Sequence, residues 1–154
     1  MIARLLMLLC LAAALPAPAR ADPEADKAAI IARLQGWADA FNARDAAGVC
    51  DLFAPDLVST VEGGEADGRD AVCGRLARLL ARDEPKFHYA PDIREVIVSG
   101  DLAVVRLFWM LTVTRGAARE VSREAGLDVF RRQPDGRWSI ARFIAFTIDA
   151  PVTR

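Results

Sequence analysis

Histidine, tyrosine and cysteine are scarce in this sequence of 154 residues, and their scarcity excludes several kinds of site. The chain contains one histidine, His88, one tyrosine, Tyr89, and three cysteines. It has no Cys-x-x-Cys pair, and no histidine stands near a cluster of cysteines and carboxylates. Transition-metal sites draw on such clusters, so we expect no metal and no cofactor. Gly63, Gly64 and Gly68 are too loosely spaced for a phosphate-binding loop.

A large charge excess and a second long apolar run are also absent. The formal net charge is −1, although 53% of the residues are hydrophobic. Much of the apolar excess lies in residues 1–21, which have a basic Arg4, an apolar run to Leu15 and an Ala-x-Ala ending at Ala21. These features are typical of a secretory signal peptide, and the run is too short to span a bilayer. We therefore predict a periplasmic or secreted protein whose residues 22–154 form a single domain.

Removal of this signal leaves 18 basic and 21 acidic residues, a net charge of −3. Such a chain lacks the broad positive surface that nucleic-acid binding requires. No apolar segment of the remaining chain has the length of a membrane span. We expect neither a nucleic-acid partner nor a membrane contact after cleavage.

Export would place the two remaining cysteines, Cys50 and Cys73, in an oxidising environment. Each stands at the edge of an apolar stripe with helical spacing. An even number of cysteines in an oxidising compartment favours a disulfide between the two helices. The alternative is a pair of buried free thiols.

Helical spacing dominates the first half of residues 22–154, and strand signals dominate the second. Three helices are predicted, at residues 22–43, from Asp45 to before Pro55, and from the loop 63–68 to near Arg82. Strands are predicted at 57–62, 87–89, 93–99, 102–114, 121–132 and 138–148, with a two-residue turn at Gly100-Asp101. This order predicts an α+β domain with three N-terminal helices on one face of a curved, mostly antiparallel sheet.

Three segments carry a resemblance to a known family. They are AFNARDAAGVCDLFAPD, GRDAVCGRLARLL and GLDVFRRQPDGRWSIARFIAF. They resemble the SnoaL-like and ketosteroid-isomerase-like branch of the nuclear-transport-factor-2-like superfamily, over nearly all of residues 24–149. The resemblance implies a cone-shaped fold. It does not fix the activity, because the superfamily includes isomerases, cyclases, dehydratases and members that only bind or dimerise.

The resemblance allows the catalytic positions of ketosteroid isomerases to be checked in this chain. Those enzymes use an aspartate base, together with a tyrosine and a protonated aspartic acid as the oxyanion hole. The tyrosine position falls at Trp37, the base position at or beside Val61, and the oxyanion-hole acid near Ala125. Glu62 and Glu124 are each one residue away, and a one-residue shift on a strand turns a side chain to the opposite face. Steroid-isomerase chemistry is therefore not expected.

Counting residues back from the predicted turns places four charged residues opposite one another on the four strands from 93–99 to 138–148. These residues share one face of the sheet with Phe108. The row is Glu95, Arg106, Asp128 and Arg142, in which facing charges attract. Burying such a row among large apolar side chains costs desolvation free energy unless the charges pair with one another or bind a ligand. It is either a self-paired structural network or the polar floor of a pocket. In the second case Arg106 and Arg142 hold an anionic or carbonyl-bearing ligand, and Asp128 orients them or acts as a general base.

Further candidates surround this row. Trp37 and Tyr89 would line the pocket, and His88 is either a proton carrier at its mouth or a structural residue. The opposite face is mostly apolar, and three helices can cover only one face, so we predict a homodimer through the uncovered outer face. The residues assigned to that outer face are Val96, Val98, Val105, Leu107, Trp109, Leu111, Val113, Leu127, Val129 and Phe143.

Three functions remain open from the sequence. The first is an exported domain that binds a small, partly apolar molecule in a cone-shaped pocket. The second is an isomerase, lyase or cyclase that uses Asp128 or His88 as its acid–base group. The third is a dimeric interaction module with a filled core. An open cavity that contains Asp128 would favour the first two.

Overall fold

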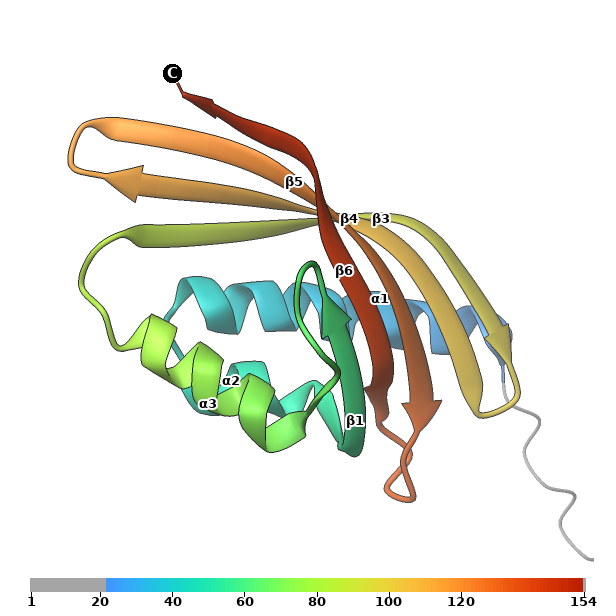
Figure 1. Ribbon diagram of the computed structural model, residues 1–154. Coiled ribbons are helices and arrows are strands. Elements are labelled where there is room, and N and C mark those ends of the chain that lie inside the picture. Colours follow the sequence, from blue (N-terminus) through green and yellow to red (C-terminus); the bar gives the residue numbers. More distant parts are fainter. Residues whose placement is uncertain (1–21, 154) are drawn as a thin grey trace, which may run out of the picture.

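The computed structural model describes residues 22–153, with side chains described to Ile148, so the predicted signal peptide at 1–21 lies outside the described residues. The described residues form three helices and six strands. They are α1 (Pro23–Asn42), α2 (Ala46–Asp51), β1 (Phe53–Val61), β2 (Asp67–Gly68), α3 (Arg69–Leu80), β3 (Lys86–Ser99), β4 (Leu102–Arg115), β5 (Ala118–Arg132) and β6 (Trp138–Thr153). Figure 1 shows the three helices on one side of a strongly curved sheet, which confirms the predicted α+β architecture.

Aspartate side chains cap the first two helices. The Asp22 carboxylate accepts a hydrogen bond of 3.0 Å from the backbone N–H of Glu24, and Pro23 takes the first helical position. The Asp45 carboxylate accepts from the first backbone N–H groups of α2 in the same way. These bonds satisfy N–H groups that have no partner within a helix, so they fix where each helix begins.

The six strands form one sheet in the order β2-β1-β6-β5-β4-β3. All neighbours are antiparallel except β1 and β6, which run parallel. The two strands predicted between Phe87 and Ser99 are a single strand, β3, which continues through Pro91. Proline is tolerated there because β3 is an edge strand and has no second neighbour to receive a ladder hydrogen bond.

The predicted row of four charges does not form, because the strand register differs at two places. Glu95 faces Arg106 as predicted, but the next turn consists of two residues, so Arg106 faces Leu127. A β-bulge between Val129 and Phe130 then shifts β6, and Asp128 faces Phe143. A shift of one residue reverses the face of every side chain beyond it. The register prediction was therefore wrong beyond its first pair.

The assignment of the two sheet faces changes with the register. The inner face, toward the helices, carries most of the side chains that were predicted to lie outside. Val105 and Leu107 are buried in the core, and Val96, Val98, Trp109 and Phe143 pack against it. The outer face instead exposes a patch of seven apolar side chains, and of these only Leu127 was predicted. The outer apolar patch consists of Ile97, Leu102, Val104, Leu127, Ile144, Phe146 and Ile148.

A buried polar contact joins the first turn of α1 to the sheet. The Asp26 carboxylate accepts hydrogen bonds from the Arg132 guanidinium at 2.6 Å and from the Trp138 indole N–H at 3.3 Å. The Arg132 guanidinium also lies over the Trp138 ring, 4.4 Å from its centroid. The hydrogen bond from Arg132 holds the pKa of Asp26 below its usual value. These contacts fix the angle at which α1 crosses the sheet.

Cys50 and Cys73 form a disulfide, as predicted, with their Cα atoms 5.6 Å apart. The bond joins α2 to α3, so it ties the two shorter helices into one layer with α1. Among the described residues, no helix combines the length and apolar character needed to cross a bilayer.

Candidate functional site

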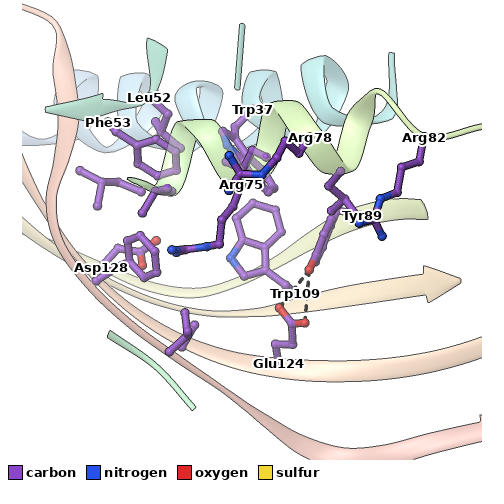
Figure 2. A pocket seen from close by; sticks show the side chains of 17 residues that line it. Trp37, Leu52, Phe53, Arg75, Arg78, Arg82, Tyr89, Trp109, Glu124 and Asp128 are labelled. Atoms are coloured by element: carbon purple, nitrogen blue, oxygen red, sulfur yellow. Dashed lines mark hydrogen bonds between the residues drawn. The ribbon is translucent and has the colours of Figure 1, made fainter. Parts of the chain in front are cut away.

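A cavity of about 500 Å³ lies between α3 and the inner face of the sheet. Figure 2 shows side chains converging on it from the helices above and the strands below. The lining is largely apolar, with an acidic group at its inner end and cationic groups along α3. The lining residues are Trp37, Leu52, Phe53, Val61, Val72, Arg75, Leu76, Arg78, Leu79, Arg82, Tyr89, Trp109, Glu124, Asp128, Ile140, Phe143 and Ala145.

Aromatic rings form one wall of the cavity. The Trp37 ring centroid lies 4.8 Å from that of Trp109 and 5.6 Å from that of Tyr89. The Tyr89 ring meets Phe41 and Trp109 edge to face, with centroids 4.8 and 5.8 Å apart. Edge-to-face contacts at these distances are attractive and hold the rings rigidly. The Trp37 indole nitrogen is buried and has no hydrogen-bond partner among the described residues.

Tyr89 and Glu124 form a polar pair at the edge of this wall. The Tyr89 hydroxyl donates to the Glu124 carboxylate, 3.2 Å from each carboxylate oxygen (Figure 2). Burial raises the pKa of Glu124, and the hydrogen bond from Tyr89 opposes that change. Burial and the neighbouring Glu124 carboxylate both raise the pKa of Tyr89, so its hydroxyl keeps its proton. The pair presents a hydrogen-bonded hydroxyl and a carboxyl group with increased proton affinity.

Asp128 is the most deeply buried acid of the cavity, with 4% of its surface exposed. Burial is the sole cause that raises its pKa, to about 7. In the described part of the chain neither a hydrogen bond nor an ion pair reaches its carboxyl group. A carboxylate without a partner in an apolar site takes up a proton instead of staying charged. Asp128 can therefore accept and release a proton near neutral pH.

The sequence of β5 sets this arrangement of acids. Residues two apart on a strand share a face, so Glu124, Gly126 and Asp128 all point inward. A Cβ atom at Gly126 would lie 3.0 Å from the Leu107 side chain. The missing side chain at Gly126 therefore gives room to Leu107, its partner on β4.

Three arginines line the cavity from the α3 side. Arg75 and Arg78 lie on α3, and Arg82 follows its C-terminus. Their spacing of three and then four residues places them on one face of the helix. Arg75 forms an ion pair with Asp67 of β2. Within residues 22–148 neither Arg78 nor Arg82 forms an ion pair with an acidic side chain.

Of the residues predicted for the pocket, the structure brings three together and leaves the others outside. Trp37, Tyr89 and Asp128 line the cavity, whereas five other candidates do not. Those five are His88, Glu95, Arg106, Phe108 and Arg142.

The register explains why these five residues lie elsewhere. His88 is exposed and neighbours Tyr89 on the strand, so it points to the opposite face. Arg106 and Glu95 form an exposed pair, with 3.7 Å between Nε and a carboxylate oxygen. The Arg142 guanidinium donates to the backbone carbonyl of Asp56 at 2.9 Å. Phe108 lies beneath the guanidinium groups of Arg94 and Arg123, and its ring points away from the cavity.

The positions implied by ketosteroid isomerases have a mixed outcome. Trp37 and Val61 do line the cavity, and neither supplies a hydroxyl or a carboxylate. Beside the third position, Glu124 lines the cavity and Ala125 does not. The sequence signal that identifies Glu124 is the alternation of β5, which places it on the same face as Asp128.

The α3 arginines were also missed from the sequence. Their helical spacing could have identified them, because it places Arg75 and Arg78 beside an apolar stripe of α3 that was assigned to the core. The stripe includes Val72, Leu76 and Leu79. Within the described ranges, no three histidine, cysteine or acidic residues are placed to share a metal ion.

Comparison with known proteins identifies relatives of the same shape. A family model described as a SnoaL-like domain matches residues 34–141. A conserved protein from Planctomyces limnophilus has a TM-score of 0.76 at 21% identity, over 84% of this chain and 99% of that one. A ketosteroid isomerase-like protein from Erwinia carotovora atroseptica has a TM-score of 0.66 at 26% identity, over 80% and 96% of the two chains.

A third structure has a similar level of likeness. It is a nuclear-transport-factor-2-like protein with a cystatin-like fold from Novosphingobium aromaticivorans, with a TM-score of 0.68 at 20% identity, covering 82% of this chain and 84% of that one. No curated protein matches the chain in sequence.

Proposed function

The chain belongs to the SnoaL-like branch of the nuclear-transport-factor-2-like superfamily, and from this premise we propose that it binds a small, partly apolar molecule in the cavity beneath α3. The observation that carries the proposal is the open cavity of about 500 Å³. Sites for small molecules are concave, mostly apolar and about 300 to 1,000 Å³ in volume, with a few polar groups that set orientation. A module with a filled core would have no such space.

Acid–base catalysis is a second candidate function, and Asp128 favours it. Its pKa of about 7 suits a group that both takes and gives a proton near neutral pH. The Tyr89 hydroxyl and Glu124 stand in the same cavity and would interact with a polar group of a substrate. His88 has no part in this proposal because it lies outside the cavity. The reaction class would be an isomerisation, an elimination or a cyclisation that starts with removal of a proton.

Blocking the cavity is expected to abolish binding. N-phenylnaphthylamine, a neutral apolar dye, should bind the wild-type protein with enhanced fluorescence. Ala145→Trp places a large ring in the cavity and should weaken this binding at least tenfold, about 1.4 kcal/mol. Ala118→Trp is the matched control, since Ala118 is exposed at the start of β5, next to the turn that joins it to β4. The proposal fails if the dye does not bind the wild type, or binds equally well to a folded Ala145→Trp variant.

The outer apolar patch supports the further proposal of a homodimer formed through this face. The patch spans β3 to β6, and Leu127 and Ile144 face each other near its centre. Large apolar side chains that gather on one exposed face often mark an interface between proteins. We expect a dimer in light scattering at micromolar concentration and a monomer for Leu127→Glu. Tyr89→Phe, a substitution within the cavity, should leave the dimer intact, and a monomeric wild type would refute this interface.

We also propose that the protein is exported after cleavage at Ala21. The disulfide between Cys50 and Cys73 supports this, because such bonds persist in oxidising compartments. An intact mass that corresponds to residues 22–154, measured on protein from the producing cells, tests the proposal.

A further inference from the structure

The mouth of the cavity has a one-sided charge that the proposed binding function leaves unexplained. Arg75, Arg78 and Arg82 line it, and Figure 2 shows Arg78 and Arg82 on the α3 side, whereas the Arg75 side chain extends down from the helix in the direction of Asp128. Asp67 offsets Arg75. The acidic residues that follow Arg82, Asp83 and Glu84, do not line the cavity. Two cations at the mouth therefore have no acidic partner in the part of the chain that the structure describes.

The position of Arg78 is built into the helix. Its guanidinium nitrogen lies 3.3 Å from the place that a Cβ atom would occupy on Gly74, one turn earlier. Gly74 thus leaves space for the guanidinium to lie back along α3 rather than to extend into water. Basic residues near the end of a helix also interact favourably with its dipole. The dipole alone would not require them to face an apolar cavity.

We propose that the ligand is an amphipathic anion, whose apolar body fills the cavity and whose acidic headgroup binds Arg78 and Arg82 at the mouth. This inference rests on the proposed binding function. The headgroup is a carboxylate, a sulfate or sulfonate, or a phosphate, because guanidinium groups bind planar or tetrahedral oxyanions with paired hydrogen bonds. The arginine pair selects the charge of the ligand, and the aromatic wall selects its apolar body.

The alternative of a cationic ligand fits the cavity poorly. An aromatic cage for a cation needs rings that surround an open space. Here Trp37, Tyr89 and Trp109 pack against one another, with centroids 4.8 to 5.8 Å apart. A cation would also have to pass the arginines. Of the acids inside the cavity, Asp128 repels an anion only partly at neutral pH, since burial raises its pKa to about 7.

Two dyes that differ by one anionic group test this inference. Anilinonaphthalene sulfonate carries a sulfonate on the aromatic skeleton of N-phenylnaphthylamine, which has none. The double variant Arg78→Gln, Arg82→Gln should weaken binding of the sulfonate dye about tenfold and leave the affinity for the neutral dye within twofold. A control variant, Arg106→Gln with Arg119→Gln, removes the same charge from exposed sites outside the cavity and should change neither affinity.

The outcomes separate this inference from the proposed function. If the neutral dye binds in the cavity but the arginine variant loses nothing, or loses both dyes equally, the anionic headgroup is refuted and the binding function stands. An equal loss of the sulfonate dye in the control variant also refutes it, because the effect would then be one of net charge. If neither dye binds the wild type, the binding function itself is refuted. All four arginines are solvent-accessible, and thermal unfolding confirms that the variants are folded.

Discussion

Between about pH 4 and pH 7 the free energy of unfolding is expected to fall by about 4 kcal/mol as the pH rises, and Asp128→Asn is expected to remove that fall. The reason is the burial of Asp128, which raises its pKa from 3.8 to about 7 in the folded protein. A difference of about three pKa units between the folded and unfolded states corresponds to about 4 kcal/mol. No other described acid that titrates in this range is buried as deeply.

The sign of the effect follows from where the proton binds. Between pH 4 and pH 7 the folded protein holds a proton on Asp128, and the unfolded chain does not. Raising the pH therefore favours the unfolded state until Asp128 ionises in both states, above about pH 7. The acids with lowered pKa values, Asp26, Asp51 and Asp56, behave in the opposite way. Each is stabilised by arginines, and that contribution is lost only as the pH falls below about 4.

Chemical denaturation at several pH values measures this dependence. Asp128→Asn keeps the shape of the side chain and cannot ionise, so its stability should stay nearly constant over the range in which the wild type weakens. Asp70→Asn, at an exposed position of α3, is the matched control and should follow the wild type. A persistent fall in Asp128→Asn would show that the acid is not the cause.

This expected instability bears on function. An unpartnered buried acid weakens the folded state at neutral pH, where asparagine or leucine would not. Residues that lower stability in this way are typical of sites where they serve binding or catalysis. The same carboxyl group lines the cavity, so the proton that it gains near pH 7 is available to a bound molecule. Ligand affinity should therefore change with pH near 7, where the fall in stability ends.

Local chemistry made the elements of this fold predictable, and long-range register made the site difficult to predict. Asp22, Asp45 and the Gly100-Asp101 turn act on their immediate neighbours, so their effects were read correctly from the sequence. The turn at Gly116 has two residues with glycine at a positive φ of 56°, and a bulge at Val129 adds a further shift. Each moves a whole strand by one residue, and neither has a local signal strong enough to fix it.

The candidate site shows the same division. Asp128 was identified as a member of the predicted row of charges, and it lines the cavity although that row does not form. Its predicted partners, Arg106 and Arg142, depended on the register and lie on the outer face. The arginines at the mouth belong to a helix, whose periodicity was visible in the sequence. Whether that face of α3 borders a cavity or a filled core depends on packing, which the sequence does not show.

Removal of the disulfide is expected to lower the free energy of unfolding by about 3 kcal/mol. The bond closes a loop between residues separated by 23 positions, and the loss of chain entropy in the unfolded state accounts for this magnitude. The helix α3 depends on the bond more than α1 does. It has 12 residues, of which Val72 and Leu80 are buried, and a helix of this length is marginal without tertiary contacts. We therefore expect α3 to separate from the sheet first when the bond is absent.

Two measurements test whether the disulfide stabilises the folded protein and holds α3 over the cavity. Cys50→Ala with Cys73→Ala should unfold at lower denaturant than the oxidised wild type, and adding a thiol reductant should bring the wild type to the same midpoint while leaving the variant unchanged. Because Cys73 is flanked on α3 by Val72, which lines the cavity, the variant should also bind N-phenylnaphthylamine more weakly under conditions where it is fully folded. Reductant that leaves the wild-type midpoint unchanged would contradict the stabilisation. Undiminished dye affinity in the folded variant would show that packing alone holds α3 over the cavity, and that the cavity does not depend on the bond.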